Sequence, residues 1–250
     1  MTFVVKPFLK WAGGKTSLVS TIKPFLPENC EQKCLIEPFL GSGAMFFFLR
    51  PKRAILSDIN IDLINCFISV RDNHKTMYSY LRKHSINNSS KYYYFIREMY
   101  NTSHSSASQS ARLIYLNKAC FNGVFRVNKD GEFNVPYSNK QTINLPSITH
   151  LSLISELLKH AELHAGPFDN ILCKAKRGDF VYLDPPYTVS HRNNGFIKYN
   201  AKLFTWQDQV KLREHVDLLT RKGALVLISN AAHDAISTLY KGYDIITIKR

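Results

Sequence analysis

The sequence predicts an α/β fold with a doubly wound, mostly parallel sheet. Short apolar segments, expected as strands, alternate with longer segments in which apolar residues recur at helical spacing. Two predicted strands, 34–37 and 54–58, end in a carboxylate, and a third ends directly before Asp184. With 250 residues, 45% of them hydrophobic, the chain suffices for one large domain or one domain with a sizeable insertion.

The first predicted α/β unit carries the clearest ligand-binding pattern. Strand 34–37 leads into a glycine turn at 38–43 and a helix at 44–49, as nucleotide-binding units of doubly wound sheets begin. The next strand ends at Asp58, about 20 residues after the start of the unit, where an acid commonly binds ribose hydroxyls. The alternative is that Asp58 is only the N-cap of the helix that begins near residue 60.

Residues 61–146 are expected to form an insert of helices with a β-hairpin near 122–137. Helical spacing is broken at 85–90 and at 101–110, and two glycine turns favour the hairpin. Residues 70–140 contain 11 Lys and Arg against 4 Asp and Glu, which is half of the net charge of +14. Interleaved aromatic residues favour a nucleic-acid surface, although the tyrosine run could instead pack inward. The aromatic residues are Tyr92, Tyr93, Tyr94, Phe95, Tyr100, Phe121 and Phe125.

The remaining segments, 1–60 and 147–250, are expected to form one domain around the sheet. A long polar loop is predicted at 188–202, after the strand that precedes Asp184. Further helices are predicted at 16–24, 152–160 and 206–220, and further strands at 162–165, 179–183, 224–229 and 243–248.

The stretch Asp184-Pro185-Pro186-Tyr187 is suited to binding a planar amino group. A carboxylate ends a strand, two prolines without N–H groups leave their carbonyls as acceptors, and an aromatic ring follows. The alternative is a proline turn in which Tyr187 only packs. Lys15 follows Gly13-Gly14 and could hold a carboxylate, but the spacing of a nucleotide-triphosphate loop is absent.

The charge and cysteine content narrow the class of protein. A net charge of +14 favours a polyanionic partner, with nucleic acid as the first candidate. The five cysteines show neither C-x-x-C nor zinc spacing, so we expect free thiols in a reducing, cytoplasmic compartment and no metal site. The N-terminus lacks an apolar leader, and no window of about 18 apolar residues predicts a membrane span.

Six motifs in a fixed order point to a family. On them the chain resembles the Dam family of DNA adenine-N6 methyltransferases, from Phe8 to the C-terminus, and their order is similar to that of the family's α class. The resemblance implies a catalytic methyltransferase domain (1–60 and 147–250) and a target-recognition insert (61–146). The motifs are Phe8–Lys15, Glu37–Gly43, Asp58–Asn60, Phe121-Asn122-Gly123-x-x-Arg126, Gly131–Pro136 and Asp184–Tyr187.

The resemblance implies S-adenosyl-L-methionine as the methyl donor, without a metal. Asp184 and the Pro185 carbonyl would accept hydrogen bonds from the target amino group, and Tyr187 would stack on the base, which must be flipped out of the duplex. Asp184 would also border the cofactor. The other implied cofactor contacts are Trp11 and Lys15 at the methionine part, Phe39 and Gly41 at the floor, Asp58 at the ribose, and Phe168 and Asp169 at the adenine.

The resemblance also implies double-stranded DNA as partner and GATC as target. Arg126 would read a guanine, Phe121 and Asn122 would lie beside the space left by the flipped base, and Lys10 would add a base contact. Val124 and Lys118 differ from residues common in close relatives, which bears on the target sequence. Alternatives are N4-cytosine methylation and a catalytically silent DNA-binding relative.

We expect a monomer acting in the bacterial nucleoid or a phage-infected cell. Family members usually continue through a final antiparallel strand beyond the point where this chain ends, so we also expect an open sheet edge.

Overall fold

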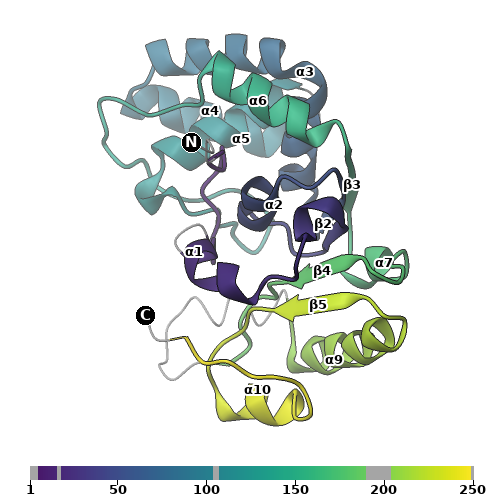
Figure 1. Cartoon of the computed structure of the whole chain (residues 1–250). Coiled ribbons are helices and arrows are strands. Elements are labelled where there is room, and N and C mark those ends of the chain that lie inside the picture. Colours follow the sequence, from purple (N-terminus) through teal and green to yellow (C-terminus); the bar gives the residue numbers. More distant parts are fainter. Residues whose placement is uncertain (1–4, 16–17, 104–106, 190–203, 249–250) are drawn as a thin grey trace.

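A five-stranded sheet forms the centre of the molecule. The computed structural model describes residues 5–15, 18–103, 107–189 and 204–248 (Figure 1). The strand order is β3-β2-β1-β4-β5, and every neighbouring pair is parallel. This confirms the predicted parallel sheet. The strands are β1 Cys34–Glu37, β2 Arg53–Asp58, β3 Ala161–Ala165, β4 Phe180–Leu183 and β5 Leu225–Ile228.

Helices cover both faces of the sheet, as a doubly wound fold requires (Figure 1). Alternate strand residues point to opposite faces, so Leu35, Leu56 and Phe180 enter one core and Ile36, Ile55 and Val181 the other. The first core includes α2 (Ala44–Leu49), α3 (Ile61–Ile86), α4 (Ser90–Thr102), α5 (Ala107–Ala119) and α6 (Ile148–Leu158). The second includes α7 (Asp169–Leu172), α9 (Trp206–Arg221) and α10 (Asp234–Leu239).

The longest helix, α3, connects the sheet to the helical layer. Only two residues separate it from β2, and the side chain of its N-cap, Asn60, accepts the Leu63 N–H at 2.9 Å. It packs along α5 and α6 and bends at Asn73, whose φ and ψ are −136° and 32°. One end of this layer is therefore fixed beside the carboxyl end of β2.

The segment after α5 is held by side chains more than by strand pairing. Tyr93 donates its hydroxyl to the Val135 carbonyl at 2.8 Å, and the Asn101 amide makes hydrogen bonds to both backbone groups of Phe133. The predicted hairpin near 122–137 is reduced to two isolated antiparallel bridges, Cys120 to Tyr137 and Val127 to Phe133. Between the two bridges, directly after Cys120, lies the 3-10 turn Phe121–Gly123.

The prediction of a last strand at 243–248 is wrong, because the described residues of this segment form no strand. Its alternating apolar residues suggested a strand, but Tyr243 anchors the segment on α9. The Tyr243 hydroxyl donates to Asp217 at 2.6 Å, and the Arg213 guanidinium lies 4.7 Å from the ring centre. These contacts hold the start of the segment against α9, and among the described residues no strand pairs with the outer edge of β5.

The first predicted helix, 16–24, is shorter among the described residues. It consists of α1 (Val19–Ile22) followed by a 3-10 turn, Lys23–Phe25, and a second 3-10 turn lies at Cys30–Gln32. The polar loop predicted at 188–202 lies outside the described residues from position 190 onward.

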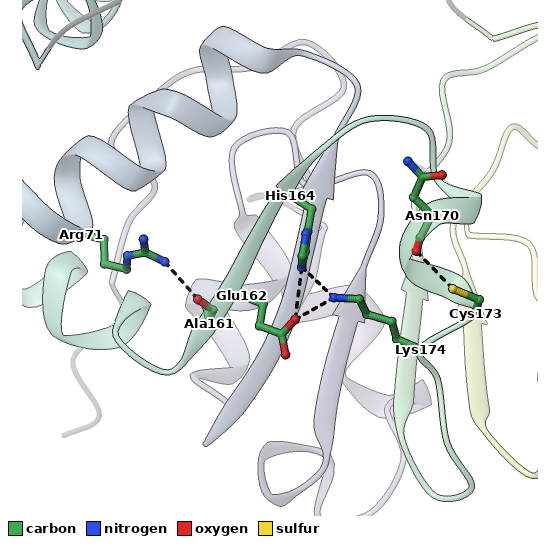
Figure 2. A network of polar contacts seen from close by, with 7 residues as sticks. All are labelled: Arg71, Ala161, Glu162, His164, Asn170, Cys173 and Lys174. Carbon is green, nitrogen blue, oxygen red and sulfur yellow. Dashed lines mark hydrogen bonds and ion pairs between the residues drawn. The ribbon is translucent and has the colours of Figure 1, made fainter.

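Charged side chains cover the free edge of β3 (Figure 2). Glu162 accepts hydrogen bonds from Lys174 at 2.8 Å and lies 3.2 Å from His164, while Arg71 of α3 reaches the Ala161 carbonyl. Such side chains discourage pairing with another strand. Beyond this cluster, the thiol of exposed Cys173 donates to the Asn170 carbonyl.

Three further observations bear on the class of protein. All five cysteines are unpaired. Within the described ranges, no helix has the length and apolar character to cross a membrane, and no group of three or more His, Cys, Asp and Glu side chains is arranged to hold a metal ion.

Candidate active site

Three carboxyl groups meet at the carboxyl ends of adjacent strands. Glu37 ends β1, Asp58 ends β2 and Asp184 directly follows β4. Since β1 lies between β2 and β4, and the strand order reverses there, this edge is the switch point at which doubly wound sheets bind ligands. Sequence reasoning placed two of these carboxylates at a site and missed Glu37, although its position at the end of an apolar strand was a visible signal.

Asp58 is held by backbone groups on both sides. Its two oxygens accept the Gly41 N–H at 2.9 Å and the Asn60 N–H at 3.0 Å. Asn60, not Asp58, caps α3, so the N-cap alternative for Asp58 is wrong. Burial raises the pKa of the Asp58 carboxyl, and backbone hydrogen bonds from Asn60, Gly41 and Ile59 oppose that rise.

Glu37 is the most enclosed of the three acids. Burial raises its pKa well above the ordinary value, and the nearby carboxylates of Asp184 and Asp58 raise it further. Its Oε2 is buried without a hydrogen-bond partner among the described residues. A carboxyl group in such surroundings favours its neutral form, which can donate a hydrogen bond.

Asp184 forms an ion pair with Lys15 across the site. The Lys15 ammonium lies 2.6 Å from Asp184 Oδ1, donates to the Gly13 carbonyl at 3.1 Å and lies 5.0 Å from the centre of the Tyr187 ring. Lys15 is only 4% exposed, so this charge depends on its partners. Lys15, which was predicted to hold a carboxylate, thus binds the carboxylate of Asp184 in this structure.

An aromatic cluster lies beside the Asp58 end of the site. The ring centres of Phe39, Phe168 and Phe204 are 5.5–5.8 Å apart. Asp169 follows Phe168, and its Oδ2 lies 2.5 Å from the Lys211 ammonium, which lowers the pKa of the Asp169 carboxyl. The structure therefore brings Phe39, Phe168 and Asp169 together, and adds Lys211, which sequence reasoning missed.

Trp11 connects the glycine turn at Gly41 to the helical layer. A Cβ on Gly41, whose φ is +50°, would lie 3.2 Å from the Trp11 ring, so any other residue here would strain the backbone and press on the ring. The Trp11 ring also stacks on Phe125, with ring centres 5.0 Å apart and 20° between the ring planes. The ring thus lies between the sheet and the predicted insert.

A groove of about 550 Å³ continues from this point toward the insert and is rich in lysine. Asn117 fixes its wall, because its amide makes hydrogen bonds to both backbone groups of Lys10 and to the Gly123 carbonyl. Burial, and then Lys10, lower the pKa of Lys118 to about 8. The groove lining includes Lys6, Lys10, Trp11, Lys118, Asn122 and Val124.

The predicted DNA contacts are exposed near this groove. Lys10, Phe121, Asn122 and Arg126 are all accessible, and Arg126 Nε donates to Asn134 Oδ1 at 2.8 Å. The tyrosine run is divided: Tyr93 and Tyr100 belong to the core, whereas Tyr94 and Phe95 are exposed. The prediction that these aromatic residues form a nucleic-acid surface is therefore wrong for Tyr93 and Tyr100.

Comparison with known proteins identifies the family. Residues 11–250 match the family described as D12 class N6 adenine-specific DNA methyltransferase. The chain belongs to this family. Members transfer a methyl group from S-adenosylmethionine to adenine in DNA, so the Dam-like resemblance and the predicted enzyme class are confirmed.

Individual members are similar over nearly the whole chain. A Type II methyltransferase, M1.LlaDCHI of Lactococcus lactis subsp. cremoris, is 35% identical over 98% of this chain and 88% of its own length. A DNA adenine methylase of Vibrio cholerae is 33% identical over the same shares. The DNA adenine methylase of Escherichia coli K12 is 34% identical over 93% of this chain and 82% of its own.

The residues at the switch point fit the donor of this methyltransferase family. Asp58 offers a fixed carboxylate of the type that binds ribose hydroxyls, and the phenylalanine cluster offers apolar faces for a purine. Asp169 Oδ1 is buried with no hydrogen-bond partner in another described residue, as an acceptor reserved for a ligand would be.

Proposed function

We propose that this enzyme transfers a methyl group from S-adenosylmethionine to N6 of an adenine that is flipped out of double-stranded GATC sites. The observation that carries the proposal is the position of Asp184-Pro185-Pro186-Tyr187 after β4, at the switch point and facing Lys15 of the glycine turn. We further propose that residues 61–146 form the target-recognition insert.

Cofactor binding is assigned to residues on the β2 side of the switch point. Asp58 would bind the ribose hydroxyls, and Phe39 and Gly41 would line the floor of the cofactor site. Phe168 and Asp169 would contact the adenine of the cofactor. Trp11 and Lys15 border the methionine part. When bound, S-adenosylmethionine supplies an electrophilic methyl group on a sulfonium sulfur.

Target binding is assigned to residues that follow β4. The Asp184 carboxylate and the Pro185 carbonyl accept the two amino protons of adenine, which favours a nitrogen lone pair that can attack. They also stabilise the positive charge that develops on that nitrogen. Tyr187 stacks on the base and restricts its orientation. Lys15 pairs with Asp184 at 2.6 Å, so it must give up or share this carboxylate when the amino group arrives.

The DNA side of the proposal rests on the lysine-rich groove and on the exposed residues beside it. Phe121 and Asn122 would lie next to the space that the flipped base leaves, and Lys10 would reach the edge of the site. Asn117, which holds Lys10 and Gly123 together, would keep these contacts in register.

Digestion of treated DNA tests the target sequence. Plasmid DNA without adenine methylation would be incubated with the enzyme and S-adenosylmethionine, then cut with an endonuclease that cleaves only unmethylated GATC. We expect protection from cleavage. Full cleavage of DNA that nevertheless contains N6-methyladenine would show that the target is another sequence.

Arg126→Ala is expected to reduce discrimination between GATC and altered sites. The arginine fork matches the O6 and N7 acceptors of guanine, and losing such a pair costs about 1–3 kcal/mol of discrimination. Methylation rates would be compared on a GATC duplex and on duplexes with one guanine replaced, with Lys129→Ala, another exposed residue of the same segment, as control. An equal loss on every duplex would instead indicate a phosphate contact.

DNA affinity is expected to fall as the pH rises through about 8, because Lys118 has a pKa of about 8 and binds a phosphate best when charged. Lys118→Ala should weaken DNA binding, remove this pH step and reduce the salt slope by about one. Lys118→Arg should bind DNA with wild-type affinity at pH 7, and its affinity should no longer fall near pH 8. Equilibrium binding at pH 7 and pH 9 measures this, and a step that persists in Lys118→Arg would contradict it.

A further inference from the structure

A half-exposed ion pair borders the aromatic cluster on the side of α9. Lys211 of α9 lies 2.5 Å from Asp169 Oδ2 and 5.7 Å from the centre of the Phe168 ring. His215, one helical turn further along α9, meets the same ring edge-on at 5.9 Å. Because residues four apart share a helix face, this face of α9 forms the outer wall of the cluster.

The two oxygens of Asp169 differ in their surroundings. Oδ2 is occupied by Lys211, whereas Oδ1 is buried without a hydrogen-bond partner in any other described residue. In an ordinary surface ion pair, the carboxylate oxygen that does not contact the lysine remains in contact with water. The backbone N–H of Asp169 itself also stabilises this carboxylate. The acceptor capacity of Oδ1 that remains is open to a donor from a ligand.

We infer that Lys211 is a positioning residue that presents Asp169 Oδ1 to the exocyclic amino group of the cofactor's purine, and that this pair selects a 6-amino over a 6-oxo purine. The inference rests on the proposed cofactor site. An ionised carboxylate offers only acceptors, so it accepts from an amino group and repels a carbonyl oxygen. Lys211 fixes which oxygen faces the ligand and keeps the carboxylate ionised.

The pair predicts a nucleobase preference that can be measured without catalysis. The full-length protein would be titrated by calorimetry with S-adenosylhomocysteine and with S-inosylhomocysteine, which differ only at the 6-position of the purine. We expect the wild type to bind the adenosyl compound at least about tenfold more tightly, as is typical for hydrogen bonds to charged groups.

Four variants separate a positioning role from a structural one. Lys211→Ala should weaken the binding of S-adenosylhomocysteine and reduce its advantage in affinity over S-inosylhomocysteine. Lys211→Arg should restore both the affinity and the advantage. Asp169→Asn should shift the preference toward the inosyl compound, because its amide can donate to a 6-oxo group. Lys222→Ala, a lysine just past the same helix, is the control and should bind as the wild type. In methylation assays, Lys211→Ala should raise KM for S-adenosylmethionine and leave kcat unchanged.

The outcomes distinguish this inference from the proposed function. If the wild type binds S-adenosylhomocysteine and methylates DNA but Lys211→Ala keeps the full preference, the inference is wrong and the proposed function stands. The same holds if Lys222→Ala changes the preference as much as Lys211→Ala. A wild type that neither binds S-adenosylhomocysteine nor methylates DNA would overturn both.

Discussion

Asp184→Ala is expected to lower methyl transfer by at least about 10²–10³-fold, the range found when one preorganised transition-state contact is removed. The carboxylate is the acceptor that follows β4 directly, and no other carboxylate in the described residues pairs with Lys15. Binding of S-adenosylhomocysteine should change far less than methyl transfer, because Asp184 only borders the cofactor and is assigned chiefly to the target amino group. Single-turnover rates and calorimetry of the variant measure the two effects separately.

The same substitution should also destabilise the protein, because it leaves the ammonium of buried Lys15 without its ion pair. Removing one partner of such a pair costs about 3–5 kcal/mol, which denaturant unfolding would detect. Asp179→Ala, at the amino end of the same strand, is the control and should retain most of the wild-type turnover. Near-normal turnover of Asp184→Ala would contradict the assignment of this residue.

Asp58→Asn is expected to weaken S-adenosylhomocysteine binding by about 10–100-fold, which corresponds to losing one or two charge-assisted hydrogen bonds. The substitution keeps the shape of the side chain, but only one of its two polar atoms can still accept. The carboxylate also receives the Gly41 and Asn60 N–H groups, so a loss of unfolding free energy of about 1–3 kcal/mol should accompany the change.

The control for Asp58 is Asp72→Asn, which removes an exposed ion pair with Arg71 on α3 and should leave cofactor affinity as in the wild type. The turnover rate of Asp58→Asn should approach the wild-type kcat when the concentration of S-adenosylmethionine is high. Unchanged affinity for S-adenosylhomocysteine in Asp58→Asn would place the ribose elsewhere.

The sequence predicted the sheet and two of its terminal carboxylates well because these features are local. An apolar strand that ends in an acid, as at Asp58, is visible in a few adjacent residues. The burial of Tyr93 and Tyr100 was also readable, since they share a helical face with Ile96. The alternating residues of 243–248 misled because Tyr243 is held by α9, a tertiary contact that local pattern does not encode.

The pairings across the site could not be predicted from the sequence. Lys15 meets Asp184, and Lys211 meets Asp169, only because the parallel sheet brings segments from distant parts of the chain to one edge. The lowered pKa of Lys118 likewise follows from its burial beside Lys10 in the folded groove. Motifs can therefore name individual site residues, while their protonation and partners depend on the fold.

Nucleoside analysis of methylated DNA tests the central claim most directly. Unmethylated duplex DNA containing GATC would be incubated with S-adenosylmethionine and either the wild type or Asp184→Ala, digested to nucleosides and analysed by mass spectrometry. The proposed site predicts N6-methyladenine with the wild type and almost none with the variant. N4-methylcytosine as the product, or equal amounts of N6-methyladenine from both proteins, would contradict it.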